Sequence, residues 1–223
     1  PPRTRPPTSS SAMRELEPER RGRRWVRGAA LFALAILAGL GVAWFGLPRL
    51  LARDALHGTA FPDPEPAPAL DGLVTADGAP VDLAADRGKA VVLFFGYTSC
   101  PDVCPTSLAL LSRAIDELGD DREDVVVYFV SVDPDRDTPE LLARYTSHFS
   151  DRIVGVTGSA DAIADAAARY GIFYELHEPD ADGYYAVDHT ASFTGIDGKG
   201  RLRVVWPSEV DVDDLASDLR HLR

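Results

Sequence analysis

The sequence predicts an α/β domain with three layers around a central mixed sheet, preceded by a single N-terminal transmembrane helix. Three observations support this prediction. One apolar run near the N-terminus is long enough to span a bilayer, two shorter apolar runs indicate buried central strands, and amphipathic helical patterns alternate with these strands. The chain has 223 residues, of which 45% are hydrophobic and 26% charged. This composition suits one globular domain and an anchor.

The predicted transmembrane anchor comprises residues 29–48. Nineteen residues from Ala29 to Leu47 carry no charge, and a helix of that length extends about 28 Å, close to the roughly 30 Å of a bilayer core. A cleaved signal peptide and a buried soluble helix are the alternatives. The run is longer than a signal-peptide core, however, and no small-residue cleavage site follows it.

The arginines that precede this run predict its orientation. Five of them lie between residues 20 and 27, and such clusters stay in the cytoplasm. Residues 1–28 are therefore expected to form a basic cytoplasmic tail. The C-terminal domain is expected on the extracytoplasmic side of the cell membrane, either periplasmic or extracellular.

The charge is divided unevenly along the chain. Residues 1–53 contain ten Arg and three Glu, a net charge of +7, and because the whole chain carries −12, the remainder carries −19. Affinity for nucleic acid comes largely from Lys and Arg that neutralise phosphates. We therefore expect no nucleic-acid partner for this domain, and cations or basic proteins fit it better. We expect a monomer.

The exposed part of the chain divides into a tether and a domain. Residues 49–70 are predicted to form a Pro-rich tether, because four prolines fall between 58 and 70 without any apolar periodicity. The domain is predicted to occupy residues 71–223. Its expected elements are a strand at 81–83, a strand at 90–95, a helix at 106–118, a strand at 125–132, a helix at 140–149, a strand at 153–156, a helix at 160–169, strands at 193–196 and 202–205, and a helix at 212–222.

The residue patterns of these segments justify the assignments. The continuous apolar runs AVVLFF and VVVYFVSV are typical of strands buried on both faces. In the helix between them, TSLALLSRAIDEL, apolar residues recur at spacings of three and four. The dipeptide Asp197-Gly198 between the last two strands predicts an antiparallel hairpin. Strand, helix, strand, helix, hairpin and helix is the order of the thioredoxin fold.

The two cysteines, Cys100 and Cys104, follow the first central strand and begin the next helix. A helix N-terminus lowers the pKa of a thiol and favours the thiolate, the form that attacks disulfides and binds metals. Their spacing differs from the Cys-x-x-Cys of common redox thioredoxins. A structural disulfide stays open as an alternative, although so short a loop gains little stability from closure. A further alternative is that both cysteines are buried in the core without a bond between them. The prolines disfavour it, because they make the segment a turn.

Two cysteines and one histidine would form a three-coordinate copper site, because thiolates favour Cu(I) and imidazole suits both oxidation states of copper. The chain has five histidines. His57 is expected beside the anchor, His148 at a helix end, His177 in a surface loop and His221 near the C-terminus. His189 precedes the hairpin strand that lies beside the cysteine turn in this topology. These positions alone leave the choice of histidine open.

Three motifs together resemble the Sco/SenC family of copper proteins, which assist assembly of the dinuclear copper (CuA) centre of cytochrome c oxidase. The motifs are Gly96-Tyr97-Thr98 with Cys100-Pro101-Asp102-Val103-Cys104-Pro105, the run Ser131-Val132-Asp133-Pro134-Asp135-Arg136-Asp137-Thr138-Pro139, and Val187-Asp188-His189-Thr190. With the weaker Gly88-Lys89 they span residues 70–205.

The resemblance implies a set of site residues and a cargo. Cys100 and Cys104 correspond to the thiolate ligands and redox pair, and His189 corresponds to the third ligand of a copper ion, Cu(I) or Cu(II). The segment from Asp133 to Pro139 by itself indicates a strand end that leads through a Pro turn into a helix capped by Asp or Thr. The resemblance implies in addition that Asp133 and Asp137 lie near the site and help shape an acidic mouth.

The resemblance also implies a function. It is that of a copper metallochaperone, which delivers copper to the CuA centre. Its partner is then the copper subunit of cytochrome c oxidase or another apo copper protein. The alternative is a thiol-disulfide oxidoreductase that reduces the target's own cysteines during oxidase assembly. A third class, a peroxidase-like enzyme, is less well supported because no separate peroxide-activating motif is present.

Overall fold

The structure is a computed structural model that describes residues 31–37, 39–41 and 56–223. Residues 31–37 and 39–41 are helical. Within the described residues, no helix is both long enough and apolar enough to cross a membrane. The structure therefore does not support the predicted transmembrane helix. The rest of segment 29–48, the tail at 1–28 and residues 49–55 of the predicted tether lie outside the described residues.

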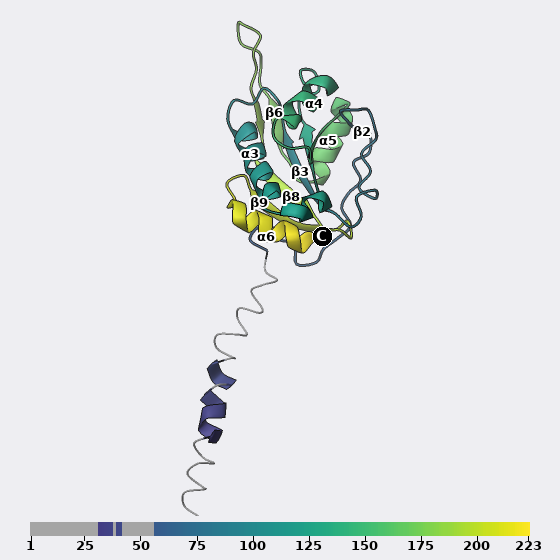
Figure 1. Cartoon of the computed structure of the whole chain (residues 1–223). Helices are drawn as coiled ribbons and strands as arrows, with labels where there is room; N and C mark the ends of the chain where they lie inside the picture. The colour runs from purple at the N-terminus through teal and green to yellow at the C-terminus, as the bar shows by residue number, and fades with distance from the viewer. Residues whose placement is uncertain (1–30, 38, 42–55) are drawn as a thin grey trace, which may run out of the picture. The chain divides into compact units, whose positions relative to one another are not determined.

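Residues 56–223 form one compact unit, built around the sheet seen in Figure 1. Its elements are β1 (Thr59–Ala60), β2 (Leu73–Thr75), β3 (Ala90–Gly96), α3 (Val103–Asp116), the 3-10 helix η2 (Gly119–Asp124), β4 (Val125–Ser131), α4 (Pro139–Ser147), β5 (Ile153–Gly158), α5 (Ala160–Arg169), β6 (Tyr174–Leu176), β7 (Val187–His189), β8 (Ser192–Ile196), β9 (Leu202–Pro207) and α6 (Val212–Leu222). The mixed sheet and the thioredoxin-like order of elements agree with the prediction.

The strand order of the main sheet is β1-β9-β8-β3-β4-β5-β2. β3, β4 and β5 are parallel neighbours, and β8 runs antiparallel to both β3 and β9. The predicted hairpin of β8 and β9 is thus confirmed. β6 and β7 form a separate two-stranded ribbon, whose connecting loop projects from one end of the domain (Figure 1).

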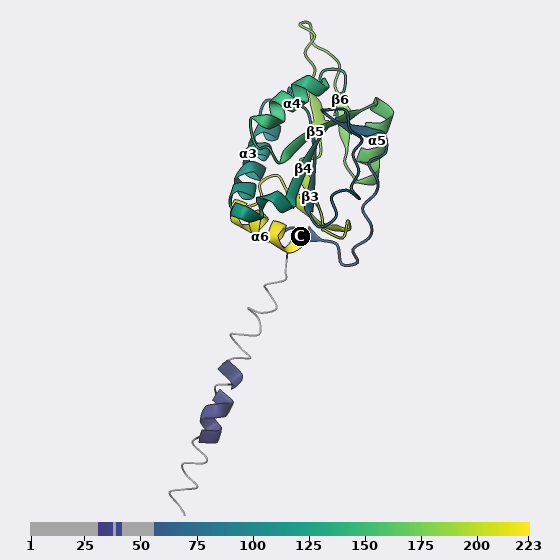
Figure 2. The ribbon, with the colours of Figure 1, turned by 45° about the vertical axis from the view of Figure 1, so that its right-hand side comes forward.

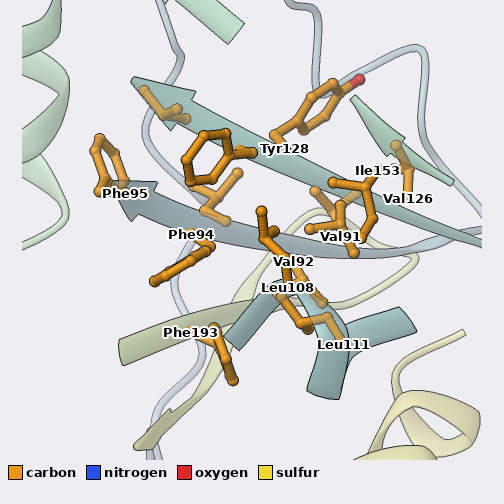
Figure 3. Packing of buried hydrophobic residues seen from close by; sticks show 14 of the residues in the cluster. Val91, Val92, Phe94, Phe95, Leu108, Leu111, Val126, Tyr128, Ile153 and Phe193 are labelled. Carbon is orange, nitrogen blue, oxygen red and sulfur yellow. The ribbon is translucent and has the colours of Figure 1, made fainter. Parts of the chain in front are cut away.

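The core has a helix layer on each face of the sheet (Figure 2). Every residue of β3 and β4 is buried, as the continuous apolar runs predicted. Helices α3, α4 and α6 cover one face, where Val92 and Phe94 of β3 meet Leu108 and Leu111 of α3 (Figure 3). Phe95 points to the other face and packs near the end of α5.

The predicted strand at Val81–Leu83 is wrong. The strand in this region is β2, which lies before the Asp77-Gly78 turn and pairs with β5. Gly78 has a φ of +85°, a left-handed conformation that reverses the chain there. After the turn only one isolated bridge, between Val74 and Pro80, continues the pairing. The Leu73 N–H, which the next ladder bond would use, instead donates to the Leu70 carbonyl at 3.2 Å, so the pairing does not extend.

The second half of the predicted tether belongs to the domain. β1 pairs antiparallel with β9, Pro66 bridges Arg201, and Leu70 is buried in the core. The prolines explain why the pattern of apolar residues did not predict that this segment pairs with the sheet. They interrupt any regular strand pattern, yet proline is tolerated at a sheet edge, where its missing N–H costs no ladder bond.

His57, near the start of this unit, contacts the last helix, α6, through Asp218. The Asp218 side chain is completely buried. The Asp218 carboxylate accepts hydrogen bonds from the His57 backbone N–H at 2.8 Å and from the Trp206 indole at 2.7 Å. It also contacts His57 Nδ1 at 2.7 Å. A buried carboxylate needs such partners, because leaving it unpaired costs several kcal/mol. The hydrogen bond to Asp218 raises the pKa of His57 above its ordinary value.

This raised pKa predicts a pH-dependent contribution of His57 to stability. The free energy from the His57–Asp218 pair is fully present below the unfolded pKa of about 6.5 and is lost as pH rises through the higher folded pKa. Since the His57 side chain is 42% exposed, we expect less than about 1 kcal/mol. Urea unfolding of wild type and His57→Gln at pH 5.5 and 8.5 measures the effect. An equal stability difference between the two proteins at both pH values would contradict it.

Candidate metal centre

The two cysteines lie where β3 turns into α3. Cys100 is half-buried in the intervening loop, and Cys104, the second residue of α3, is completely buried. Both are free thiols. The Cys104 backbone N–H points to Cys100 Sγ at 3.4 Å, so the helix N-terminus faces the sulfur. Pro105 suits the first turn of the helix, because an N–H at that position has no partner within the helix.

Gly96 leaves the space that the Cys104 sulfur occupies. A Cβ atom at this position would lie 2.7 Å from Cys104 Sγ and 2.8 Å from the Phe129 ring. Both neighbours are buried, so a larger residue would displace one of them. The glycine that ends β3 is therefore part of the site's geometry, which explains its place in the first motif.

His189, the last residue of β7, brings its imidazole to the cysteines. Its Nε2 atom lies 3.4 Å from Cys104 Sγ. The other ring nitrogen, Nδ1, lies 3.3 Å from the Thr190 carbonyl and donates its hydrogen there, which leaves the Nε2 lone pair directed at the sulfur. The ring is packed edge-on against Tyr97 and Phe94, at centroid distances of 5.9 and 6.3 Å.

The structure thus brings all three predicted ligands together. One donor atom from each of Cys100, Cys104 and His189 lies within 4.8 Å of the others, and within the described part of the chain this is the only group of three or more His, Cys, Asp and Glu residues with such spacing. Two atoms bonded to one metal at about 2.0 to 2.3 Å are at most about 4.6 Å apart, so little movement would close the site. Two sulfurs and one imidazole form a soft donor set suited to copper.

The other four histidines do not approach this group. They are bonded elsewhere: His57 to Asp218, His148 to the Arg144 carbonyl, His177 to Asp188 at 2.9 Å, and His221 to the Ser217 carbonyl at 2.8 Å. The fold thereby makes the choice that the histidine positions left open, because β7 is the element that brings a histidine to the cysteines.

Burial shifts the pKa values of the buried groups at this site. Desolvation raises the pKa of the Cys104 thiol far above its ordinary value, lowers the pKa of His189, and raises the pKa of Tyr97 to about 12. The expectation that the helix N-terminus makes Cys104 a thiolate is therefore wrong for this residue. The helix dipole acts over a distance of one turn, but removing a thiolate from water costs more. Burial therefore favours the neutral thiol at Cys104 and the neutral imidazole at His189.

Asp133 and Asp137 do not shape an acidic mouth, because both side chains are completely buried. Asp137 instead holds the cysteine loop. Its carboxylate accepts hydrogen bonds from the Thr98 backbone N–H at 2.9 Å, from the Thr98 hydroxyl, and from the Ser131 hydroxyl at 2.7 Å. Thr98 precedes Cys100 by two residues, so this carboxylate fixes the start of the loop that carries the first sulfur.

Asp133 holds the strand that carries the imidazole. Its carboxylate accepts a hydrogen bond from the Tyr185 hydroxyl at 2.7 Å and forms an ion pair with Arg136. Arg136 donates to the Tyr185 carbonyl at 2.8 Å and lies 3.6 Å from the centroid of the Tyr185 ring. Tyr185 precedes His189 by four residues. Sequence reasoning missed Arg136 and Tyr185, since no spacing pattern links them across 49 positions.

The fold and site define a thioredoxin-like protein with a Cys-Cys-His centre at the end of its sheet. The model of the SCO1/SenC family matches residues 72–223. The chain therefore belongs to the SCO1/SenC family.

Individual relatives agree with this assignment. The SCO2-like protein of Rickettsia conorii is 36% identical over 116 residues, covering 52% of this chain and 57% of that protein. The chain thus spans little more than half the length of this curated relative. Apo Sco1 of Thermus thermophilus is 38% identical with a TM-score of 0.66, covering 76% of this chain and 98% of that structure. Bradyrhizobium japonicum ScoI, solved with copper bound, is 34% identical with a TM-score of 0.63, covering 76% and 100%.

The buried Asp137 carboxylate leads to a prediction about the stability of the site. Asp137→Asn keeps the shape of the side chain, but its amide N–H₂ cannot accept the hydrogen bond of one of the three donors that face the carboxylate. We therefore expect a loss of about 1 to 3 kcal/mol in the free energy of unfolding. Urea unfolding measures this loss. Asp135→Asn, an exposed neighbour in the same turn, is the matched control. Equal stability of the two variants would show that Asp137 does not hold the loop.

Proposed function

We propose that this chain is a copper metallochaperone that holds one copper ion between Cys100, Cys104 and His189 and delivers it to the CuA centre of cytochrome c oxidase. The observation that carries the proposal is the convergence of two free thiols and the Nε2 atom of an imidazole at one point. Membership of the SCO1/SenC family supports it, as does the copper bound to the related Bradyrhizobium protein. The acceptor is the oxidase copper subunit or another apo copper protein.

Copper is the cargo in this scheme, and the burial of the ligands sets the order of events. On loading, the Cys104 thiol releases its proton as a copper–sulfur bond forms, since only the thiolate binds metal. On delivery, the half-buried Cys100 is the ligand that an incoming sulfur of the acceptor reaches first. Each bond from copper to this chain is replaced by one to the acceptor, and the displaced thiolate takes up a proton. The oxidation state of copper does not change.

The proposed setting is the extracytoplasmic face of the cell membrane. The uncharged run at 29–47 and the arginines before it support a single-pass anchor with the domain outside. The domain itself begins at residue 56, so few residues separate the proposed anchor from the folded unit.

The alternative function is reduction of the acceptor's own disulfide. The accessible position of Cys100 and the backbone N–H that faces its sulfur favour this alternative. Cys100 would attack the target disulfide as a thiolate to give a mixed disulfide. Cys104 would then displace the target's second thiolate, which leaves this chain oxidised and the target reduced. An external dithiol reductant would have to regenerate the chain.

His189 distinguishes the two functions, because it is a copper ligand in one and no reactant in the other. For His189→Ala we expect copper affinity to fall at least about 100-fold, more than loss of an outer hydrogen-bond partner usually costs. Competition with a Cu(I) chelator under reducing conditions measures the affinity, and His221→Ala is the control.

Two results would count against the chaperone. One is wild-type copper affinity in His189→Ala. The other is full oxidase assembly in cells that carry His189→Ala, together with failed assembly in cells that carry Cys100→Ser, which would favour the reductase.

The anchor leads to a separate prediction. Because a single spanning helix is not extracted by alkaline carbonate, the full chain should stay in the membrane pellet, whereas a chain starting at residue 56 should be released. A membrane-impermeant thiol reagent should label Cys100 in intact cells if the domain is outside. Recovery of the full chain in the soluble fraction would contradict the anchor, and labelling only after lysis would contradict the orientation.

A further inference from the structure

The large apolar side chains exposed on the described part of the domain gather around the metal centre. Apart from Phe61 near β1, they are Val103, Phe173, Leu176 and Tyr184. We call these four residues the apolar rim. Isolated exposed apolar residues are ordinary, but a cluster of them marks an interaction site.

Short connections tie the apolar rim to the copper ligands. Val103 directly precedes Cys104. Phe173 exchanges two hydrogen bonds with Thr190, the residue after His189, at 2.9 and 3.0 Å. Leu176 pairs with Val187 at the far end of the β6–β7 ribbon, and Tyr184 lies in the loop that joins the two strands. The four residues thus lie at the start of α3, along the β6–β7 ribbon that carries His189, and in the loop of that ribbon, which projects from one end of the domain (Figure 1).

Phe173 shows that this exposure does not come from poor packing. Its side chain is 61% exposed, although its backbone is fixed by both hydrogen bonds to Thr190. The fold therefore holds a large aromatic ring in water beside the strand pair that carries His189. Holding it there forgoes the stabilisation that burial of such a side chain contributes.

Carboxylates surround the apolar rim with little to balance them. The exposed acidic residues here are Asp102, Asp135, Glu175, Glu178, Asp180, Asp182 and Asp188. Between residues 170 and 198 the sequence contains no Lys or Arg, although Asp188 pairs with His177 at 2.9 Å. The nearest guanidinium, that of Arg136, is paired with the buried Asp133. The surface around the metal centre is therefore strongly negative.

The basic side chains at the other end of β8 are already paired with carboxylates. Arg201 and Arg203 form ion pairs with Asp197, and Arg223 forms ion pairs with Asp121 and Asp124. The described surface around the metal centre carries no such set of cations. A basic partner is attracted to the end with the metal centre, whereas two copies meeting through their apolar rims would bring like charges together.

We propose that the apolar rim and its carboxylates form a docking surface for a basic protein, which covers the rim with an apolar patch and places its own metal ligands against Cys100. The occupant is the copper acceptor, so this inference rests on the proposed function. The apolar contact supplies affinity and excludes water from the site, while the carboxylates steer and orient the encounter. Such steering commonly raises association rates 10- to 1,000-fold and weakens with salt.

The experiment measures copper transfer from the full chain to the apo copper domain of the oxidase subunit from the same organism. Two changes test the surface: Phe173→Ser, and the double reversal Glu178→Lys with Asp182→Lys. Their matched controls are Phe61→Ser, and Glu117→Lys with Asp120→Lys, which alter exposed residues away from the rim. Copper affinity and transfer to a small chelator, which needs no docking, are measured for each variant.

We expect both test variants to slow transfer to the acceptor domain about 10-fold or more, and the charge reversal to weaken its salt dependence. Copper affinity, transfer to the chelator and both controls should stay within about twofold of wild type. Equal transfer rates for test and control variants would overturn the docking surface and leave the proposed function standing.

Two further outcomes would overturn the inference in other ways. A wild-type chain that binds copper but transfers none to the acceptor domain would refute the proposed function, and with it this partner. Self-association of wild type in sedimentation, abolished by Phe173→Ser, would assign the surface to a second copy of the chain.

Discussion

The geometry of the metal centre depends on two buried carboxylates in the turn between β4 and α4. Asp137 holds the loop that carries Cys100, and Asp133 holds the strand that carries His189. The backbone N–H of Asp137 donates to the Asp133 carbonyl at 2.9 Å, which joins the two anchoring points. A buried carboxylate is costly unless every oxygen is bonded. The turn can therefore exist only when both flanking loops are in place, and this couples the position of the sulfur to that of the imidazole.

This coupling explains how ligands from distant parts of the sequence stay assembled without a metal. Cys104 and His189 lie 85 residues apart but are in contact. Closing such a loop carries an entropic cost that folding of the domain has already met. A copper ion then meets a preorganised set of donors, and its binding energy is not spent on ordering the chain. The cost that remains is chemical, because the buried Cys104 thiol must lose its proton.

Much of this arrangement could be predicted from the sequence, because local patterns encode it. The apolar runs of β3 and β4 identify buried strands, and the Asp197-Gly198 turn identifies the hairpin. The resemblance, rather than any spacing, singled out His189. The roles of Asp133 and Asp137 could not be inferred, since nothing in a local pattern shows whether an Asp in a Pro-rich turn is exposed or buried. For the same reason the helix dipole suggested a thiolate at Cys104, whereas its burial, a property of the whole fold, favours the thiol.

The unequal burial of the two cysteines bears on the choice between holding a metal and exchanging disulfides. Exchange needs both sulfurs in turn as thiolates, and burial makes the Cys104 thiolate costly because no positive charge compensates it. A bound cation supplies that compensation. Burial therefore slows the step of a reductase in which Cys104 attacks the mixed disulfide. Once the Cys104 thiolate has formed, however, burial strengthens its attraction to a metal ion. Cys100, half-exposed, is reactive in either role. Burial of Cys104 therefore favours metal binding over disulfide exchange.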